Sequence, residues 1–360
     1  MNIRVDLGTR GYDIAISTGN RSNFVPFVFS TRDRLTSAFV LTDDNAESQA
    51  SPLAHMLDSA GVKTRYVSLP PGEASKSQEM LARIYDELAD FPADRQTLFV
   101  AIGGGVIGDL GGFAAATWNR GMPLLMVPTT LLAMVDSSVG GKTGINHPSG
   151  KNLIGSFHQP TGVWIDTDTL ETLPGREYLS GLAEVVKYGM ILDPELFVWL
   201  EQNADSLLKR DPEAVCHIVS RSCRLKADVV EKDEREELGL RIVLNYGHTF
   251  AHAFENVSGY GTWLHGEAVS AGMICASRLA EKRGLIDSIV TMRQRRLLQQ
   301  FGLPIAPLMD WAIPDLIRSM YRDKKAEHGK LRFVLPKKIG EVATFADIPE
   351  SQVRDVLAGN

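Results

Sequence analysis

Glycines crowd the residues that follow a short apolar run at 98–102. Gly103, Gly105 and Gly108 fit the pattern G-x-G-x-x-G. Glycine lets backbone amides approach a phosphate closely, and the N-terminus of a following helix adds a partial positive charge. The pattern alone is weak evidence, because tight turns use the same residues. It indicates a nucleotide phosphate site only if other residues support it.

Hydroxyl, amide and charged side chains follow within the next residues. A second apolar run at 124–127 leads into Pro128 and the hydroxyls of Thr129 and Thr130. The stretch beyond contains almost no charge except at its candidate ligands, which are Asp136, Lys142, Lys151 and Asn152. Backbone amides, hydroxyls and ammonium groups together are what a polyanion site needs. We therefore expect residues 98–160 to bind a polyanion.

Histidines at helical spacing form a second candidate site. The residues Arg241, Asn245, His248 and His252 are separated by four, three and four positions, which predicts a shared face on one helix over 241–257. A solvated face is the alternative interpretation, and the aligned arginine and asparagine favour a face that meets a ligand. Position 249 is threonine, so the H-E-x-x-H motif of zinc proteases is not supported.

Charged residues also occupy positions where apolar ones are expected. Glu184 and Lys187 lie three residues apart in the apolar segment 181–189. A carboxylate there is costly unless it is paired or bound to metal, and a surface Glu–Lys pair is the alternative. Lys226 interrupts an apolar helical stripe, where it could reach to water or meet a phosphate or carboxylate.

Four residues are candidate metal ligands. A catalytic zinc has three protein ligands and an open position. The nitrogen and oxygen donors that suit it are Glu184, His248, His252 and His265. Spacing does not say which three would bind.

Composition bounds the class of protein. The chain has 360 residues, of which 44% are hydrophobic and 23% charged, as expected for a globular protein of two domains. The net charge of −6 and the scattered basic residues argue against nucleic acid or an acidic membrane as partner. We expect no signal peptide and no membrane span. Three cysteines without metal or disulfide spacing predict a cytoplasmic protein.

Strands and helices alternate over the first 165 residues, which predicts a parallel sheet wrapped by helices. Residues 2–6 and 12–16 predict a hairpin, and further strands are expected at 38–42, 64–69, 98–102, 124–127 and 163–166, with helices at 47–60 and 76–90. Later segments are mainly helical, at 177–190, 194–209, 212–232, 241–257, 265–283, 287–301 and 350–358, with strands at 331–335 and 342–346. We place the domains at 1–170 and 171–360.

Long motifs give the chain a family resemblance. The glycine-rich stretch continues into PTTLLAMVDSSVGGKTGIN, and later blocks read GLAEVVKYG, NYGHTFAHAFE and GYGTWLHGEAV. These blocks keep their order from about residue 40 to 335, and they resemble the 3-dehydroquinate synthase family of sugar-phosphate cyclases. The resemblance implies an α/β, Rossmann-like NAD-binding domain and a mainly helical domain for metal and substrate.

The resemblance also implies a reaction. Such an enzyme converts 3-deoxy-D-arabino-heptulosonate 7-phosphate into 3-dehydroquinate and phosphate, the second step of the shikimate route to chorismate and aromatic amino acids. NAD transiently oxidises a ring hydroxyl, phosphate leaves by β-elimination, the hydride returns, and ring opening precedes an aldol closure. The implied cofactors are NAD and a divalent metal, with zinc preferred to cobalt. A homodimer is implied, in which Arg120 crosses the interface.

Residue roles are carried over from the resemblance onto matching positions. The implied metal ligands are Glu184, His248 and His265, which leaves His252 to the substrate phosphate. The residues implied around the phosphate and the reacting carbons are Lys142, Asn152, Arg241, Asn245, His252 and one of Lys324 or Lys325. Those implied at the substrate carboxylate and hydroxyls are Lys187 and Lys226, oriented by Asp136. The leaving phosphate can itself remove the proton, so no protein general base is assigned.

The dinucleotide residues follow the early strands. Asp43 and Asn45 could hold ribose hydroxyls, and an Asx turn is the alternative interpretation. The full set implied by the resemblance is Asp43, Asn45, Pro71, Gly72, Glu73, Lys76, Gly104, Gly105, Val106, Ile107, Gly108, Asp109, Thr129, Thr130, Lys142, Lys151, Thr169, Leu170, Glu171 and Thr172.

Other functions compete with this one. Iron- or zinc-dependent polyol dehydrogenases share G-G-G-x-x-x-D and P-T-T, but a neutral polyol gives the lysine and arginine set no anionic partner. Another sugar-phosphate cyclase is a nearer rival, and DSSVGGKT favours dehydroquinate. A P-loop ATPase is not supported, because Asp136 stands where that motif needs its first glycine. An inactive metabolite-binding protein would be expected to have lost a metal or phosphate residue.

Overall fold

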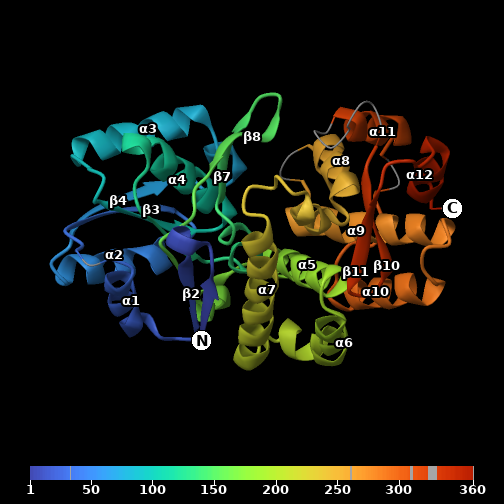
Figure 1. Cartoon of the computed structure of the whole chain (residues 1–360), viewed down its shortest axis with the longest axis horizontal. Coiled ribbons are helices and arrows are strands. Elements are labelled where there is room, and N and C mark those ends of the chain that lie inside the picture. The colour runs from blue at the N-terminus through green and yellow to red at the C-terminus, as the bar shows by residue number, and fades with distance from the viewer. Residues whose placement is uncertain (33, 260–261, 309–310, 323–330, 360) are drawn as a thin grey trace. The chain divides into compact units, whose positions relative to one another are not determined.

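The computed structural model describes residues 1–32, 34–259, 262–308, 311–322 and 331–359. The chain divides into two compact units, coloured along the chain in Figure 1. Unit 1 contains Met1–Leu173 together with Val215–Arg235, and unit 2 contains Pro174–Ala214 together with Glu236–Asn360. The helix α7 (Pro212–Lys232) therefore belongs almost wholly to unit 1, although it follows residues of unit 2 in the chain.

Unit 1 is built on a seven-stranded sheet with the order β1-β2-β9-β6-β5-β3-β4. Its strands are β1 (Asn2–Val5), β2 (Tyr12–Ser17), β3 (Ser37–Asp43), β4 (Lys63–Leu69), β5 (Leu98–Gly103), β6 (Leu124–Pro128) and β9 (Gly162–Asp166). The strand β1 pairs antiparallel with β2, and the remaining neighbours are parallel. The predicted α/β architecture and the N-terminal hairpin are confirmed.

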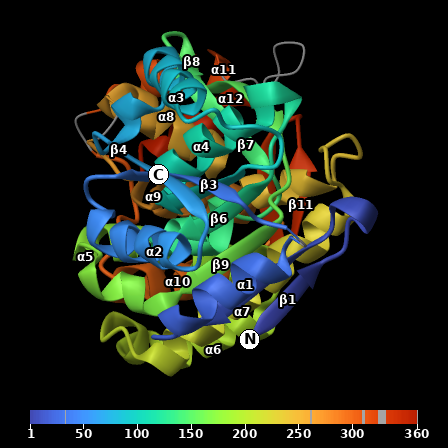
Figure 2. The same cartoon turned by 90° about the vertical axis from the view of Figure 1, so that its left-hand side faces the viewer.

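Helices cover both faces of this sheet. The helices α1 (Phe24–Ser30) and α2 (Glu47–Ser59) lie on one face, and α3 (Gln78–Asp90) and α4 (Gly105–Thr117) lie on the other (Figures 1 and 2). Apolar residues of α2 recur at helical spacing as Ala50, Leu53, Ala54 and Leu57, and all four are buried. The helix α3 begins where the Ser77 hydroxyl accepts a hydrogen bond from the Met80 amide.

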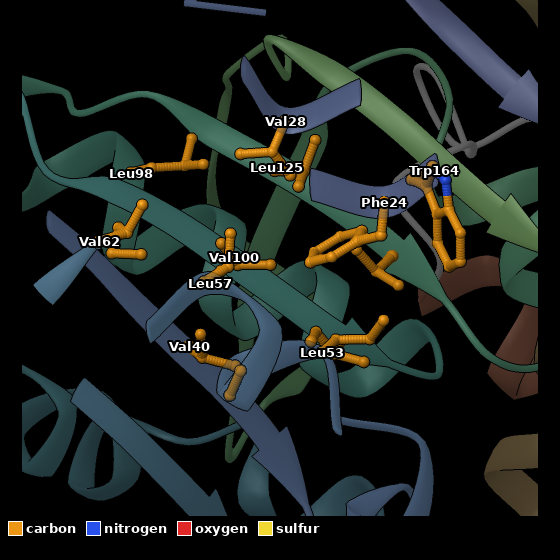
Figure 3. Close-up of a cluster of buried hydrophobic side chains, with 14 of the residues drawn as sticks. Phe24, Val28, Val40, Leu53, Leu57, Val62, Leu98, Val100, Leu125 and Trp164 are labelled. Carbon is orange, nitrogen blue, oxygen red and sulfur yellow. The ribbon is translucent and has the colours of Figure 1, made fainter. Parts of the chain in front are cut away.

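One hydrophobic core of unit 1 lies between the sheet and the helices α1 and α2. Figure 3 shows Val40, Val100, Leu125 and Trp164 of the strands meeting Phe24, Val28, Leu53 and Leu57 of the helices. Phe24 and Trp164 meet edge to face, with ring centroids 5.2 Å apart. Each such side chain contributes about 1.5–3 kcal/mol when fully buried. The core therefore fixes the strands whose carboxyl ends carry the candidate nucleotide residues.

Several elements of unit 1, the helix α1 among them, were not predicted from the sequence. An antiparallel hairpin joins β7 (Lys142–His147) to β8 (Gly150–Phe157), and a short π-helical turn, η5 (Ala133–Ser137), precedes it. The strand β8 is mostly exposed and lacks a regular apolar alternation. This explains why the period-2 pattern gave no signal there.

Unit 2 is mainly helical, as predicted. Its helices are α5 (Gly175–Ile191), α6 (Pro194–Leu208), α8 (His248–Ser258), α9 (His265–Lys282), α10 (Ser288–Gln300), α11 (Ile313–Arg322) and α12 (Glu350–Leu357). The strands β10 (Phe333–Lys338) and β11 (Glu341–Phe345) form an antiparallel pair. The helix α9 is buried along most of its length and contacts α5, α8, α10, α12 and β10, so it is the central element of this unit.

The single helix predicted over 241–257 is wrong. The structure has a 3-10 helix, η7 (Leu240–Asn245), and α8 begins only at His248. Gly247 separates them in the left-handed conformation, with φ of 80°. A Cβ atom at this position would lie 2.8 Å from the backbone nitrogen of Met273, so the chain passes too close to α9 for any side chain.

None of the described helices is long and apolar enough to cross a membrane.

Candidate functional site

The glycine-rich turn of unit 1 connects β5 to the N-terminus of α4. A Cβ atom on Gly104 would lie 3.1 Å from Thr130 Cγ2, and one on Gly105 would lie 3.3 Å from Ser137 Oγ. Side chains at these positions would crowd Thr130 and Ser137 beside the first turn of the helix, whose free backbone amides can bind an anion. The residues around this turn therefore fit the pyrophosphate of a dinucleotide.

Other glycines of α4 serve packing. A Cβ atom on Gly111 would lie 2.9 Å from Phe99 Cε1, and one on Gly112 would lie 2.5 Å from Thr143 Cγ2. At Gly108, the third glycine of the pattern, the nearest atom is 3.8 Å away, an ordinary contact. The close approach of helix and sheet that this pattern usually assigns to its third glycine depends here on Gly111 and Gly112.

Most of the predicted dinucleotide residues lie at or just after the carboxyl ends of neighbouring parallel strands, whereas Lys142 and Lys151 lie in the hairpin β7–β8. Those at the strand ends are Asp43 and Asn45 at β3, Pro71, Gly72, Glu73 and Lys76 after β4, Gly104 to Asp109 after β5, Thr129 and Thr130 after β6, and Thr169 to Thr172 after β9. Parallel strands end at the same edge of a sheet. The chain order reverses between β3 and β5, which makes this edge a topological switch point, the usual ligand site of such sheets.

Asp43 forms the Asx turn that was the alternative interpretation of its role. Its Oδ1 accepts hydrogen bonds from the amides of Asn45 and Ala46 at 3.0 and 3.1 Å. Burial raises the pKa of this carboxyl, while those amides act in the opposite direction. The geometry leaves the ribose role of Asp43 as a proposal.

A buried lysine connects the candidate nucleotide residues to the hairpin. Lys76 is 5% exposed, and its Nζ donates to Asp109 Oδ2 at 2.7 Å and to Asn152 Oδ1 at 2.5 Å. Burial raises the pKa of Asp109, and the Lys76 ammonium counteracts this. Asn146 also joins the group, since its Nδ2 donates to Glu73 Oε1 at 2.7 Å. Predicted nucleotide and substrate residues are thus brought together.

Lys226 of α7 has a carboxylate partner within unit 1. Its Nζ donates to Asp136 Oδ1 at 2.6 Å and to the Asp136 carbonyl at 2.5 Å. The lysine is 5% exposed, so the competing interpretation, a lysine that reaches into water, does not describe it. Lys142 lies exposed at the start of β7, and Lys151 is half-buried in β8.

Arg120 lies in an exposed loop with unusual backbone geometry. Asn119 and Arg120 adopt φ values of 51° and 66°, and Gly121 follows at 118°. Such conformations are uncommon for residues with a side chain. The loop is held by hydrogen bonds from Trp118 Nε1 to the Ala93 carbonyl and from Arg95 Nε to the Asn119 carbonyl, both 3.0 Å.

Three helices of unit 2 bring Glu184, His248 and His265 together. One ligand atom from each lies within 4.8 Å of the others. Glu184 Oε1 is 3.5 Å from His265 Nε2 and 3.9 Å from His248 Nε2. His252 is not in this group, although its ring centroid is only 5.7 Å from that of His248. The geometry separates the four candidates that spacing left open into three and one.

The negative charge of Glu184 lies beside groups that can carry a positive charge. This carboxylate is fully buried and forms an ion pair with Lys187, which is itself 2% exposed. Burial lowers the pKa of His265, but Glu184 and Glu255 outweigh burial and raise it to about 10. His248 Nδ1 lies 3.1 Å from the Tyr246 carbonyl, so its proton belongs there and Nε2 keeps its lone pair for a ligand. One carboxylate and two imidazoles suit a divalent metal such as zinc.

The remaining predicted residues of unit 2 lie near this group in the chain. Arg241 is 2% exposed, and its Nε lies 3.4 Å from Glu236 Oε1. Asn245 ends η7, and His252 is half-buried one turn after His248 on α8. Lys324 and Lys325 lie outside the described residues.

Sequence reasoning missed two interactions near the start of α9. Glu255 faces His265 Nδ1, and Arg176 pairs with Glu267 two positions after it, with both hydrogen bonds at 2.7 Å. Glu255 continues the spacing of His248 and His252 by three positions and lies between the apolar residues Ala253 and Phe254 and the helix end, which was a usable signal. No sequence pattern connects Arg176 with Glu267, which lies 91 positions away.

The sheet of unit 1 and the Glu–His–His group of unit 2 define a class of enzymes with an α/β nucleotide-binding part and a helical metal-binding part. Within this class, the chain belongs to the 3-dehydroquinate synthase family. The model of the family's N-terminal part matches residues 66–180, and the model of its C-terminal part matches residues 181–326. The expected family and architecture are confirmed.

Curated relatives cover nearly the whole chain. A 3-dehydroquinate synthase of Rhodopirellula baltica is 48% identical over 362 residues, which cover 98% of this chain and 95% of the relative. A 3-dehydroquinate synthase of Desulforamulus reducens is 46% identical over 357 residues and 99% of both chains.

Solved structures share the fold. The 2-epi-5-epi-valiolone synthase of Streptomyces hygroscopicus, with NAD+ and Zn2+ bound, is 29% identical, with a TM-score of 0.88 and coverage of 97% of this chain and 96% of that one. A 2-deoxy-scyllo-inosose synthase complexed with carbaglucose-6-phosphate, NAD+ and Co2+ has a TM-score of 0.88 at 24% identity, covering 100% and 99%. A probable glycerol dehydrogenase of Sinorhizobium meliloti is more distant, with a TM-score of 0.60 at 15% identity, covering 96% and 95%.

Proposed function

We propose that the chain catalyses the 3-dehydroquinate synthase reaction, the conversion of 3-deoxy-D-arabino-heptulosonate 7-phosphate into 3-dehydroquinate and phosphate. The observation that carries the proposal is that three cations, Lys187, Lys226 and Arg241, are 5% exposed or less and each lies beside a carboxylate. Buried charges are costly unless they are paired. A substrate that carries a phosphate and a carboxylate offers these cations further anionic partners, whereas a neutral polyol offers none.

The cofactors of the proposal are NAD and a divalent metal, with zinc first and cobalt second. When bound, NAD would supply a transient oxidation that acidifies the C–H next to the departing phosphate, and the metal would supply Lewis acidity at the oxygen of the C–O bond being oxidised. Residues after the strand ends of unit 1 would hold the dinucleotide, with its pyrophosphate at the N-terminus of α4. Glu184, His248 and His265 would hold the metal.

The chain's own residues bind and orient the substrate in this proposal. Arg241, Asn245, His252, Lys142 and Asn152 would surround the phosphate and stabilise the negative charge that grows on it as it leaves. Lys187 and Lys226 would hold the carboxylate and hydroxyls, and Asp136 fixes the ammonium of Lys226 at 2.6 Å. Because the departing phosphate can accept the proton itself, no side chain is assigned as general base.

Further parts of the proposal concern organisation and location. Residues 1–170 are assigned to NAD, and residues 171–360 chiefly to metal and substrate. We expect a cytoplasmic homodimer in which Arg120 of one copy acts in its partner. The exposure of Arg120 supports this role, which needs an accessible guanidinium.

The first experiment is a phosphate-release assay with the heptulosonate phosphate, a catalytic amount of NAD and Zn2+, with NADH absorbance followed in parallel. The expected result is phosphate release without NADH accumulation, stopped by a chelator. Steady NADH formation from glycerol or another polyol, without phosphate release, would instead assign the chain to the dehydrogenases that share its fold. Phosphate release that yields a different carbocycle would indicate another sugar-phosphate cyclase.

A further inference from the structure

We infer that Glu255 is a positioning residue that fixes the ring and the tautomer of His265 for metal binding. Glu255 lies on α8 and is 5% exposed. Its Oε1 lies 3.5 Å from His265 Nδ1, while Glu184 Oε1 lies 3.5 Å from Nε2 on the opposite side of the ring. The imidazole is therefore held between two carboxylates. The inference rests on the proposed metal site.

Glu184 and Glu255 have different roles, because Nε2 and Nδ1 of His265 have different roles. A metal-binding histidine must offer the lone pair of one nitrogen, and the partner of the other nitrogen decides where the proton stays. With the proton of Nδ1 directed at Glu255, the lone pair that Nε2 would offer once a metal replaces its proton points toward Glu184 and His248. His248 is oriented in the same way, with Nδ1 at 3.1 Å from the Tyr246 carbonyl. Both histidines thus present Nε2 to one point.

Glu255 adds charge where Tyr246 adds only a dipole. A negative charge on Nδ1–H increases the electron density of the ring and makes Nε2 a better ligand. Burial of this carboxylate on a helix face is costly without a partner, and His265 is one side chain that faces it. Its neighbours along α8, Ala253 and Phe254, are buried and apolar. A purely packing role at this position would be filled better by an apolar residue.

Metal affinity of the whole chain tests this inference. The variants are Glu255→Ala, which removes the acceptor, and Glu255→Gln, which keeps an acceptor oxygen without the charge. Asp193→Ala is the matched control, because Asp193 is a buried carboxylate of unit 2 that accepts from the amides of Glu195 and Leu196 at the start of α6. Zn2+ and Co2+ dissociation constants are measured on the metal-free proteins by competition with a chromophoric chelator, and thermal unfolding is followed on the same samples.

The expected result is that Glu255→Ala weakens Zn2+ binding by roughly 10- to 100-fold, the usual effect of removing such a partner. Glu255→Gln should lie between the parent and Glu255→Ala. Asp193→Ala should lower the unfolding temperature and change the dissociation constant less than about twofold. Glu255→Gln preserves the shape of the side chain. If Glu255→Ala does not fold, the Zn2+ dissociation constant of Glu255→Gln therefore tests the inference.

Two outcomes overturn the inference and are distinguishable. If the parent binds Zn2+ and the Glu255 variants bind it equally well, Glu255 has only a structural role and the proposed metal site stands. If neither the parent nor a His248→Ala variant binds Zn2+ or Co2+ above background, the metal site itself fails, and the role of Glu255 fails with it.

Discussion

The fully buried carboxylate of Glu184 is surrounded by groups that can carry positive charge. Lys187 forms an ion pair with it, and a protonated His265 faces it at 3.5 Å. The high pKa of His265 means that, without metal, a proton is held where a divalent cation would add its charge. Metal binding must release this proton, so affinity for the metal should rise with pH.

The separation of His248 from His252 leads to a prediction at the residue scale. His248→Ala should abolish metal retention, because it removes one of three ligand atoms that lie within 4.8 Å of one another. His252→Ala should keep the metal and lose turnover, since its proposed partner is the substrate phosphate. Metal content by atomic emission and phosphate release check both variants. Equal metal loss in the two would contradict the assignment.

Because His158 is half-buried, we predict that the stability of unit 1 falls at acid pH. Burial lowers the pKa of His158, while the hydrogen bond of its Nε2 with the Met122 carbonyl at 2.9 Å acts the other way. The folded-state pKa of His158 therefore lies below the ordinary value of about 6.5, so the unfolded chain takes up the proton more readily than the folded one. As the pH falls below about 6.5, protonation of the unfolded chain lowers the free energy of unfolding. We expect His158→Gln to lose less unfolding free energy than the parent between about pH 7.5 and 5.

Urea unfolding at the two pH values measures this difference. His55→Gln is the control, because His55 is exposed on α2 of the same unit. A parent and a His158→Gln variant with identical pH dependence would show that another group causes any acid sensitivity.

At the scale of elements, glycines in and after the β5–α4 turn have two different roles, one in NAD binding and one in the stability of the fold. Gly105→Ala places a methyl group 3.3 Å from Ser137 Oγ, in front of the helix N-terminus, and should weaken NAD binding about tenfold with little change in stability. Gly112→Ala places a methyl group 2.5 Å from Thr143 Cγ2. Overpacking there should cost about 1–3 kcal/mol, against a helix-propensity gain of at most about 1 kcal/mol.

NAD titration by protein fluorescence and thermal unfolding distinguish the two variants. The expected pattern is weaker binding at normal stability for Gly105→Ala and normal binding at lower stability for Gly112→Ala. A Gly105→Ala variant that binds NAD as tightly as the parent would remove the pyrophosphate from this turn.

Elements with one repeating pattern could be predicted from the sequence, and elements fixed by distant partners could not. The buried parallel strands and the helices α2, α5 and α9 have strong apolar signals over their full length. The hairpin β7–β8 has an exposed strand without alternation, and the break at Gly247 arises from α9, which approaches it from residues far along the chain.

The candidate site shows the same limit. Glu184 and Lys226 were recognisable as anomalies because they occupy apolar helix positions. Their partners could not be predicted from the sequence. Lys226 meets Asp136, which lies 90 positions away, and His265 meets Glu184 and Glu255, which lie on separate helices. Spacing along one element identifies residues that share a face, whereas the choice of three ligands from four depends on how helices pack.

At the scale of the whole molecule, the two units do not correspond to two halves of the chain. Residues 215–235 belong to unit 1, where Arg224 Nη1 donates to the Arg4 carbonyl at 2.7 Å and Cys223 Sγ lies 3.3 Å from the Met134 carbonyl. Lys226 therefore belongs to unit 1, although the boundary near residue 170 assigns it to the second domain. Unit 1 is therefore complete only with residues 215–235, which follow residues 174–214 of unit 2 in the chain.

This organisation predicts that a fragment of residues 1–173 will not fold stably by itself. It lacks five fully buried apolar residues of α7, namely Ile218, Val219, Cys223, Ala227 and Val230. Burial of the larger ones contributes about 1.5–3 kcal/mol each, so their sum is a large part of the roughly 5–15 kcal/mol that stabilises a domain. A fragment in which a flexible linker joins 1–173 to 215–235 should unfold cooperatively and bind NAD, while 1–173 alone should bind a hydrophobic dye and show no sharp transition. If 1–173 alone has the same unfolding temperature and NAD affinity as the joined fragment, α7 is dispensable and unit 1 ends at Leu173.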